Sequence, residues 1–273
     1  MTDFHVAKEE LGRASDGYNE VTRELSRRGA TKLKSYFPDC LPTCKRINGQ
    51  PSRFKRHHLA PETKKQLYCR ALYPKHIAFL NAGDEHRERG LIAGNRIGKS
   101  DVGGFEVACH MTGLYPDWWK GRRFTEPVTV WAAGDTGKTT RNIIQAKLLG
   151  PMTNIGSGFI PAHLLINTQK KTGVPNAVEM IWVRHIPTGL ISVCELKSYD
   201  QRREGFQGTA QHVIWLDEEP PEDVYAECLL RCTKTGDFPG GVMMLTFTPL
   251  QGRTPLVQTF LKEGVRPDFE TDD

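Results

Sequence analysis

Short apolar runs separated by polar turns recur along the chain, a pattern typical of strands buried in an α/β protein. Four runs are candidate strands, at residues 91–92, 128–133, 213–216 and 242–247. Residues 178–185 and 190–196 alternate around a turn at 187–189 and predict a β-hairpin. The pattern therefore predicts an α/β domain, with irregular structure over 150–176.

Apolar residues at helical spacing occupy other segments of the chain. Residues 17–36 carry them at loose intervals, and residues 62–72 predict a second helix that the next proline ends. Prolines and a glycine between these segments predict a linker over 38–61. The other predicted helices are at 100–111 and 143–148.

Glycines, a lysine and a serine follow the first apolar run in the pattern of a phosphate-binding loop, with alanine in place of the first glycine. The eight residues of this loop are Ala93, Gly94, Asn95, Arg96, Ile97, Gly98, Lys99 and Ser100. Chance alone produces such a pattern in roughly a few per cent of chains of this length. The strand predicted before it and the helix predicted after it favour a nucleotide-binding loop.

Each residue type in this loop suits phosphate chemistry. Gly94 and Gly98 let the backbone bend so that successive N–H groups point at phosphate oxygens. Lys99 brings a compact positive charge to the β and γ phosphates, and Ser100 offers a hydroxyl to Mg²⁺. The new helix adds the positive end of its dipole. The loop therefore predicts a site for a nucleoside triphosphate with Mg²⁺.

A second candidate element is the apolar run at 213–216, which leads into Asp217, Glu218 and Glu219. At the tip of a central strand, Asp217 would bind Mg²⁺ through its water shell, and Glu218 would orient the water that attacks the γ phosphate. A solvated acidic strand end is the structural alternative, but the pairing with the phosphate loop favours catalysis. The doubled carboxylate also argues against a small-molecule kinase. Glu219 is assigned no role.

The third candidate element is the run at 242–247, which ends among Thr246, Thr248 and Pro249. The two hydroxyls are candidates for sensing the γ phosphate, and so for coupling hydrolysis to movement. A plain strand end is the alternative, and only the other two elements favour the functional interpretation.

Length and composition limit the class of protein. The chain has 273 residues, a formal net charge of +5 and seven cysteines. This length can bury a sizeable core. Runs of about eighteen apolar residues and an apolar leader are both missing, so we expect neither a transmembrane helix nor a signal peptide. The odd, scattered cysteines favour a reducing compartment over a disulfide framework.

Positive charge is concentrated in one segment. Residues 21–60 hold ten basic and two acidic residues, whereas residues 61–273 hold twenty-five of each. The densest clusters are at 45–46 and 53–58. A solvated arm and a contact with nucleic acid phosphates both explain this excess, and the sequence favours neither.

Some cysteines and histidines partly match the spacing of a zinc finger: Cys40, Cys44, His57 and His58. The two histidines are adjacent, where a finger needs three to five residues between them, so the spacing argues against a metal site. Cys228 and Cys232, four apart on an expected helix, are interpreted as ordinary buried thiols.

Aromatic and basic residues interleave over 115–124. Such interleaving can stack on bases, but the adjacent Trp118 and Trp119 favour the anchoring of a loop to the core. We therefore predict a packed surface loop here.

Together the motifs resemble the ATPase domain of the large terminase subunit of tailed bacteriophages, the motor that packages DNA into phage heads. The resemblance spans about residues 70–260. It rests on the segments 93–100, 217–220 and 246–249 and, more loosely, on 118–123 and 134–141. An arginine inside the phosphate loop, here Arg96, is a common feature of that family.

The resemblance implies a RecA-like (ASCE) P-loop ATPase of the α/β class, with a mostly parallel sheet flanked by helices and a strand between the two ATP motifs. Residues 1–61 would form a helical, basic N-terminal extension and linker, 62–254 the ATPase core, and 255–273 a C-terminal lid or linker. Family members normally carry an RNase H-like nuclease domain after the ATPase. The residues after the third element are too few to build one, so nuclease activity is not expected in this chain.

The implied activity is hydrolysis of ATP with Mg²⁺, coupled to translocation of double-stranded DNA into a preformed head. The implied partners are the portal protein, the small terminase subunit and further copies of the chain in a ring on the portal. The expected location is the host cell cytoplasm and transiently the procapsid, not a membrane or the mature virion. A helicase-like DNA translocase and a nucleotide-dependent DNA-binding regulator are the alternatives.

Ring motors commonly complete each site with an arginine from the next subunit, because the transition state spreads extra negative charge over the γ-phosphate oxygens. Arg141, after a predicted strand end, is the candidate for this role, and Arg96 is expected to act within its own subunit. Arg202 and Arg203 are rivals, and a surface ion pair is the alternative for Arg141.

Overall fold

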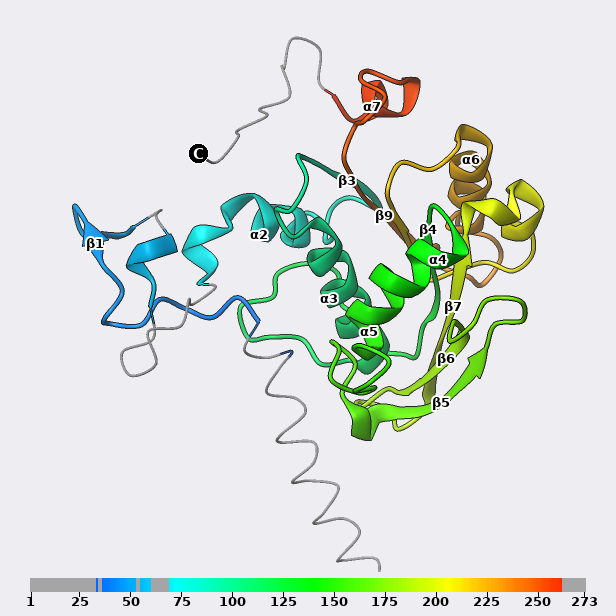
Figure 1. Cartoon of the computed structure of the whole chain (residues 1–273), viewed down its shortest axis with the longest axis horizontal. Coiled ribbons are helices and arrows are strands. Elements are labelled where there is room, and N and C mark those ends of the chain that lie inside the picture. The colour runs from blue at the N-terminus through cyan, green and yellow to red at the C-terminus, as the bar shows by residue number, and fades with distance from the viewer. Residues whose placement is uncertain (1–32, 34–35, 53–54, 60–68, 262–273) are drawn as a thin grey trace, which may run out of the picture.

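The computed structural model describes residues 33, 36–52, 55–59 and 69–261 (Figure 1). Almost all of the helix predicted over 17–36, most of that predicted over 62–72, part of the basic segment and residues 262–273 lie outside this range. Of the second predicted helix, residues 69–72 are described, and Arg70–Leu72 form a short 3-10 helix, η2, with Cys69 as its N-cap. Within the described residues, no helix is long and apolar enough to cross a membrane.

The centre of the molecule is one seven-stranded sheet. Its strands are β3 Glu88–Ile92, β4 Thr129–Gly134, β5 Leu165–Lys170, β6 Val178–Arg184, β7 Ile191–Ser198, β8 Val213–Asp217 and β9 Val242–Phe247. Their order is β3-β9-β8-β4-β7-β6-β5. The first five strands in this order, β3, β9, β8, β4 and β7, pair in parallel. Strand β6 then pairs antiparallel with β7, and β5 pairs antiparallel with β6. The sheet is thus mostly parallel, and β9 lies between β3 and β8, as the resemblance implied.

The predicted buried strands and the hairpin are confirmed, with boundaries that shift by a few residues. The prediction of irregular structure over 150–176 is wrong for Leu165–Lys170, which pairs with β6 as the edge strand β5. Most side chains of this strand are polar and none is fully buried, so the sequence carries no apolar run there. The second arm of the hairpin, β7, also pairs with β4 and joins the hairpin to the central sheet.

Helices connect the strands. They are α2 Pro74–Asn81, α3 Lys99–Thr112, α4 Gly137–Thr140, the π-helical turn η3 Arg141–Gln145, α5 Ala146–Leu149, α6 Glu222–Arg231 and α7 Pro255–Phe260. The predicted helix at 143–148 begins earlier, at Gly137, because Thr136 and Thr139 form a capping box. Helix α2 was not predicted, since Pro74 was interpreted as a break. Proline instead occupies the first helical turn, where its missing N–H costs nothing.

Helices cover both faces of the sheet (Figure 1). In β4, Val130 and Ala132 belong to one core cluster, whereas Trp131 and Ala133 belong to the other, as the alternation of a strand requires. The first cluster includes residues of α3 and α5, and the second includes residues of α6 and α7. The observed architecture is therefore a three-layer α/β/α domain, and the predicted fold class is confirmed.

Helix α3 lies unusually close to the sheet. A Cβ atom on Gly103 would meet the indole of Trp215 at 2.3 Å, so only glycine permits this approach. Trp215 is fully buried in the central strand β8. The contact fixes the start of α3 beside the carboxyl ends of the strands.

Two further sequence interpretations are confirmed. Trp119 is 4% exposed and donates from Nε1 to the Gly121 carbonyl at 2.9 Å, while the Trp118 ring stacks on Phe105 at 6.1 Å. The two tryptophans therefore anchor their loop to the core. The cysteines at 228 and 232 are buried thiols at the end of α6.

Candidate nucleotide-binding site

The predicted phosphate loop joins a strand to a helix. Strand β3 ends at Ile92 and α3 begins at Lys99, with Gly98 as its N-cap at a φ of 89°. Arg96 is exposed at the turn and also has a left-handed backbone, with a φ of 64°. A non-glycine residue rarely adopts this conformation, which often marks functional loops. The loop thus stands at the carboxyl edge of the sheet, where ligands of open α/β sheets bind.

Two neighbours hold the loop in place. The Ala93 amide donates to the Phe247 carbonyl of β9 at 3.3 Å, and His76 of α2 donates from Nε2 to the Ile97 carbonyl at 2.9 Å. Burial lowers the pKa of His76, although the Ile97 hydrogen bond and Asp101 act in the opposite direction. Sequence reasoning missed His76, because α2 was not predicted and a single histidine forms no motif.

The Lys99 side chain crosses the mouth of the loop. Its ammonium donates to the Gly94 carbonyl at 2.7 Å and to Oγ1 of Thr248 at 2.8 Å. Burial lowers the pKa of Lys99, while the carboxylates of Glu218 and Asp217 act to raise it. The arrangement places one positive charge between the loop and the acids of β8.

Asp217, the last residue of β8, is almost completely buried and receives hydroxyl hydrogen bonds from two elements. Ser100 Oγ donates to its two oxygens at 2.9 and 3.0 Å, and Thr246 Oγ1 donates at 2.7 Å. Burial raises the pKa of Asp217 to about 6, against the lowering effect of the Thr246 and Ser100 hydrogen bonds. The structure thus brings together the two residues that the sequence predicted to share Mg²⁺.

Glu218 follows Asp217 with a left-handed φ of 68°, which turns its side chain out of the strand direction. Tyr199 clamps this turn, because its hydroxyl donates to the carbonyls of Asp217 at 3.1 Å and of Glu218 at 3.0 Å. A strained turn of this kind persists only where surrounding contacts hold it. Tyr199 was also missed, since it belongs to no sequence motif.

The two threonines at the end of β9 make different contacts. Thr246 is fully buried, supports Asp217 and accepts a hydrogen bond from Nε1 of Trp215 at 2.7 Å. Thr248 touches the loop instead, since it accepts from Lys99 and donates to Oδ1 of Asn95 at 2.8 Å. Thr248 is therefore the threonine that links β9 to the phosphate loop.

Glu219 received no role from the sequence, and the structure gives it a contact. Its carboxylate accepts a hydrogen bond from the hydroxyl of Thr254, the N-cap residue of α7. Glu219 therefore ties the end of β8 to that helix.

The candidate arginines lie in different surroundings. Arg141, in η3, donates to the Pro175 carbonyl at 2.8 Å and to Asn142 at 3.0 Å, so its described hydrogen bonds do not reach the phosphate loop. Arg203 forms an ion pair with Glu227 at 3.0 Å, and Arg202 is exposed at a left-handed turn with a φ of 52°. Of these four candidates, Arg96 is the one that lies in the loop itself.

The donor set of this edge fits a hydrated Mg²⁺ ion and a phosphate chain. Ser100 and Asp217 supply hard oxygen ligands, which Mg²⁺ prefers. Loop amides, the start of α3 and Lys99 supply positive charge for phosphate oxygens. Glu218 is half-buried, directly follows Asp217 in the chain and acts to raise the pKa of Lys99.

Comparisons with known proteins show which protein family the sequence matches. Residues 91–271 match the family described as "Terminase large subunit, T4likevirus-type, N-terminal". The large terminase subunit of Salmonella phage P22 is 40% identical over 216 residues, which cover 72% of this chain and 42% of that protein. The chain therefore spans less than half the length of this relative.

Solved structures of large terminases are also similar, at lower identity. The ATPase domain from Thermus phage P74-26 is 14% identical, with a TM-score of 0.42 and coverage of 71% of this chain and 72% of that one. The large terminase of bacteriophage HK97 is 12% identical, with a TM-score of 0.39 and coverage of 80% of this chain and 37% of that one. The family match covers well over half of the residues of this chain, which therefore belongs to the family of T4-like-virus-type terminase large subunit N-terminal domains.

Proposed function

We propose that the chain is the ATP-hydrolysing motor part of a viral terminase, which moves double-stranded DNA into a preformed head. The carrying observation is the contact between Ser100 and Asp217, 117 positions apart, beside Lys99 in a member of the terminase family. This arrangement suits phosphoryl transfer to water, which needs charge at the phosphates and an oriented nucleophile.

In this proposal each residue has a separate task. Lys99 and the loop amides bind the β and γ phosphates of ATP, and Glu218 orients the attacking water. Ser100 and Asp217 would hold Mg²⁺, which neutralises charge on the phosphate oxygens when it is bound. Thr248, in contact with both Lys99 and Asn95, is placed to couple the state of the loop to β9.

The remaining parts of the proposal extend to partners and organisation. We propose a ring of copies on the portal protein, served by the small terminase subunit, in the host cytoplasm and transiently on the procapsid. Residues 1–61 would be an extension and linker, 62–254 the ATPase core and 255–273 a lid or linker. We assign no DNA cutting to these 273 residues, and incubation with plasmid and Mn²⁺ tests that point.

The decisive experiment compares ATP turnover of the wild-type chain and Glu218→Gln, with and without double-stranded DNA. The amide keeps the shape of the side chain but polarises water poorly, so turnover should fall by about a hundredfold or more while ATP binding persists. Glu222→Gln, an exposed acid in the first turn of α6, is the matched control and should hydrolyse ATP normally.

Two results would contradict the proposal. Near-normal turnover by Glu218→Gln removes the catalytic assignment. If double-stranded DNA does not stimulate turnover, and the chain displaces neither a strand of the duplex nor a third strand bound to it as a triplex, the nucleotide-dependent regulator is favoured over the motor.

A further inference from the structure

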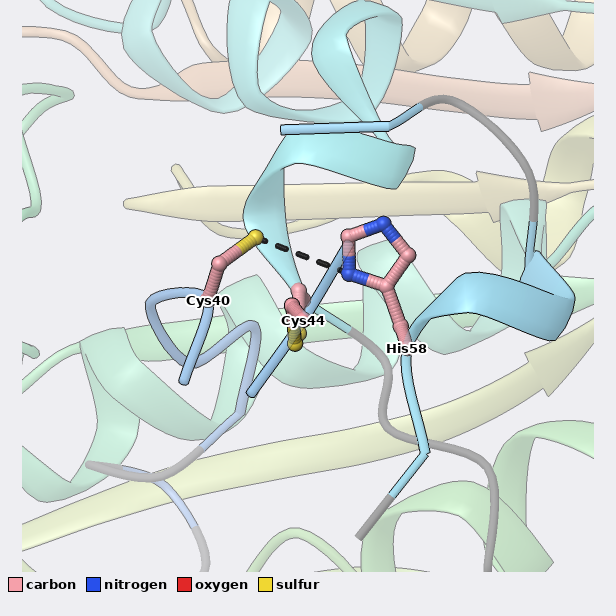
Figure 2. Close-up of side chains that lie close together, drawn as sticks. Cys40, Cys44 and His58 are labelled. Carbon is pink, nitrogen blue, oxygen red and sulfur yellow. Dashed lines mark hydrogen bonds between the residues drawn. The ribbon is translucent and has the colours of Figure 1, made fainter. Parts of the chain in front are cut away.

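Three cysteines and one histidine that the nucleotide site does not use converge near the start of the described chain. They are Cys40, Cys44, His58 and Cys69, named here the Cys3His cluster. One ligand atom from each lies within 4.8 Å of the others. Figure 2 shows Cys40, Cys44 and His58 lying close together, with the sulfur of Cys40 directed at the ring of His58.

Backbone hydrogen bonds bring these separate segments together. The Lys45 amide donates to the His57 carbonyl at 3.1 Å, which joins the stretch after Cys44 to the residue before His58. The Arg70 amide donates to the Pro38 carbonyl at 2.9 Å, which joins the residues beside Cys69 and Cys40. The four ligands are therefore placed by the fold of the segment and not by a single short motif.

The spacing of the ligand atoms matches a tetrahedral zinc site. Zinc lies about 2.3 Å from sulfur and about 2.0 Å from nitrogen, so tetrahedral ligands stand about 3.8 Å apart for two sulfurs and about 3.5 Å for sulfur and nitrogen. The sulfurs of Cys44 and Cys69 are 3.9 Å apart, and the Cys40 sulfur is 3.6 Å from Nδ1 of His58. Both pairs therefore fit around one ion with little movement.

The imidazole of His58 is already oriented as a ligand. Its Nε2 lies 2.6 Å from the Ser52 carbonyl, which can only accept a hydrogen bond, so Nε2 carries the proton. In the neutral ring Nδ1 then holds the lone pair, which points toward the sulfur of Cys40. Metal-bound histidines characteristically donate from their other nitrogen to a carbonyl or carboxylate in this way.

Burial favours a structural role for the site. His58 and Cys69 are 0% exposed and Cys44 is 3% exposed. The segment around them contains only short elements among its described residues. They are the two-residue strands β1 Arg46–Ile47 and β2 Gln50–Pro51 and the 3-10 helices η1 Lys55–His57 and η2 Arg70–Leu72. Small segments of this kind commonly use a metal ion in place of an extended apolar core.

We propose that the Cys3His cluster binds one Zn²⁺ ion and that this ion organises the described residues around Cys40, Cys44, His58 and Cys69. Four protein ligands fill the tetrahedral coordination, which marks a structural site without an open catalytic position. Binding releases the thiol protons to solvent. The spacing that argues against a metal site assumes a finger with two histidines, whereas the proposed set takes His58 alone and adds Cys69, 25 positions after Cys44.

The test uses the full-length chain purified without chelators. Elemental analysis should find one zinc per chain, and exchange into Co²⁺ should give the visible absorption of a tetrahedral cobalt–thiolate centre. This measurement on the wild-type chain needs no variant to fold. Zinc absent from the purified chain together with no such cobalt spectrum would overturn the proposal. So would a metal-free chain in which peptide mapping finds a disulfide between two cysteines of the cluster.

Variants show which side chains bind the ion. Cys44→Ser and His58→Ala should each weaken zinc binding by more than about a hundredfold. This loss exceeds the roughly 10–100-fold loss expected when a residue that only supports a ligand is changed. Cys232→Ser, a buried thiol at the end of α6, is the matched control and should keep one zinc per chain. Zinc retained at the wild-type level by both cluster variants would contradict the assignment.

Discussion

The Ser100 hydroxyl donates to both carboxylate oxygens of Asp217, at 2.9 and 3.0 Å. The serine lies in the first turn of α3 and the aspartate ends β8, so this contact joins the phosphate loop to the strand that carries the acids. Strand β9 lies between β3 and β8, and its Thr246 donates to the same carboxylate. One carboxylate therefore joins helix α3 and the strands β8 and β9.

Thr246→Val should destabilise the chain by about 1–3 kcal/mol, because the buried Nε1 of Trp215 loses its acceptor. Urea unfolding measures this free energy. Thr248→Val, at a partly exposed position, is the matched control and should cost less than about 1 kcal/mol while lowering ATP turnover. Equal unfolding midpoints for the two variants would show that the hydrogen bond to Trp215 contributes nothing.

The buried pair of Arg89 and Glu106 supplies a second stability test. Their side chains are 4% and 0% exposed at an N–O distance of 2.6 Å. Burial acts to raise the pKa of Glu106, but Arg89 and His110 outweigh it and hold that pKa below its usual value. Glu106→Gln should therefore cost about 3–5 kcal/mol in urea unfolding, because it leaves the Arg89 charge without a partner.

The matched control for this pair is Asp101→Asn. Asp101 pairs with Lys147 at 2.7 Å, and both side chains are 35% exposed. Solvent screens this pair, so its loss should cost less than about 1 kcal/mol. If Glu106→Gln lowers the free energy of unfolding no more than Asp101→Asn does, water must reach the Arg89 charge and replace its lost partner.

His76 makes the stability of the folded chain depend on pH. Its pKa is below the ordinary value of 6.5 chiefly because of burial, so the folded state binds fewer protons than the unfolded state. This contribution to stability is present above pH 6.5 and is lost as the pH falls from there toward the folded pKa. Unfolding free energies across this range should therefore decline.

His76→Gln separates this effect from general acid denaturation. The amide can still donate to the Ile97 carbonyl but does not titrate, so the decline below pH 6.5 should become shallower. The same slope for wild type and variant would remove His76 as its source.

We expect Arg141 to complete the site of a neighbouring subunit. Arg141→Ala chains keep the site and lose the arginine, whereas Glu218→Gln chains keep the arginine and lose the site. A mixture of the two should regain ATPase activity, because some interfaces pair an intact arginine with an intact site. Steady-state turnover across mixing ratios measures this.

The control mixture combines Arg141→Ala chains with chains that carry both substitutions. No interface in it has an intact arginine, so activity should stay at the level of Arg141→Ala alone. If the first mixture regains no more activity than this control, Arg141 does not act between subunits and its hydrogen bond to the Pro175 carbonyl is structural.

Much of the nucleotide site could be predicted because its signals are local. The loop from Ala93 to Ser100 needs glycines, a lysine and a hydroxyl at fixed spacing, and Asp217 and Glu218 follow an apolar strand. These patterns depend on neighbouring residues alone. The same holds for β8, whose apolar run from Val213 to Leu216 is uninterrupted.

Other parts of the protein depend on contacts between distant segments. His76 holds the phosphate loop and Tyr199 holds the Glu218 turn. No sequence motif indicates the hydrogen bonds by which they do so. The polar edge strand β5 is recognisable only from its pairing with β6.

The sequence by itself determined the class of fold and the chemistry of the phosphate loop, because apolar periodicity and loop spacing are properties of consecutive residues. Only the tertiary structure decided which hydroxyls reach Asp217 and that Cys69 joins Cys40, Cys44 and His58. The physical reason is that hydrogen bonds and metal coordination act over a few ångströms in space, whatever the separation along the chain.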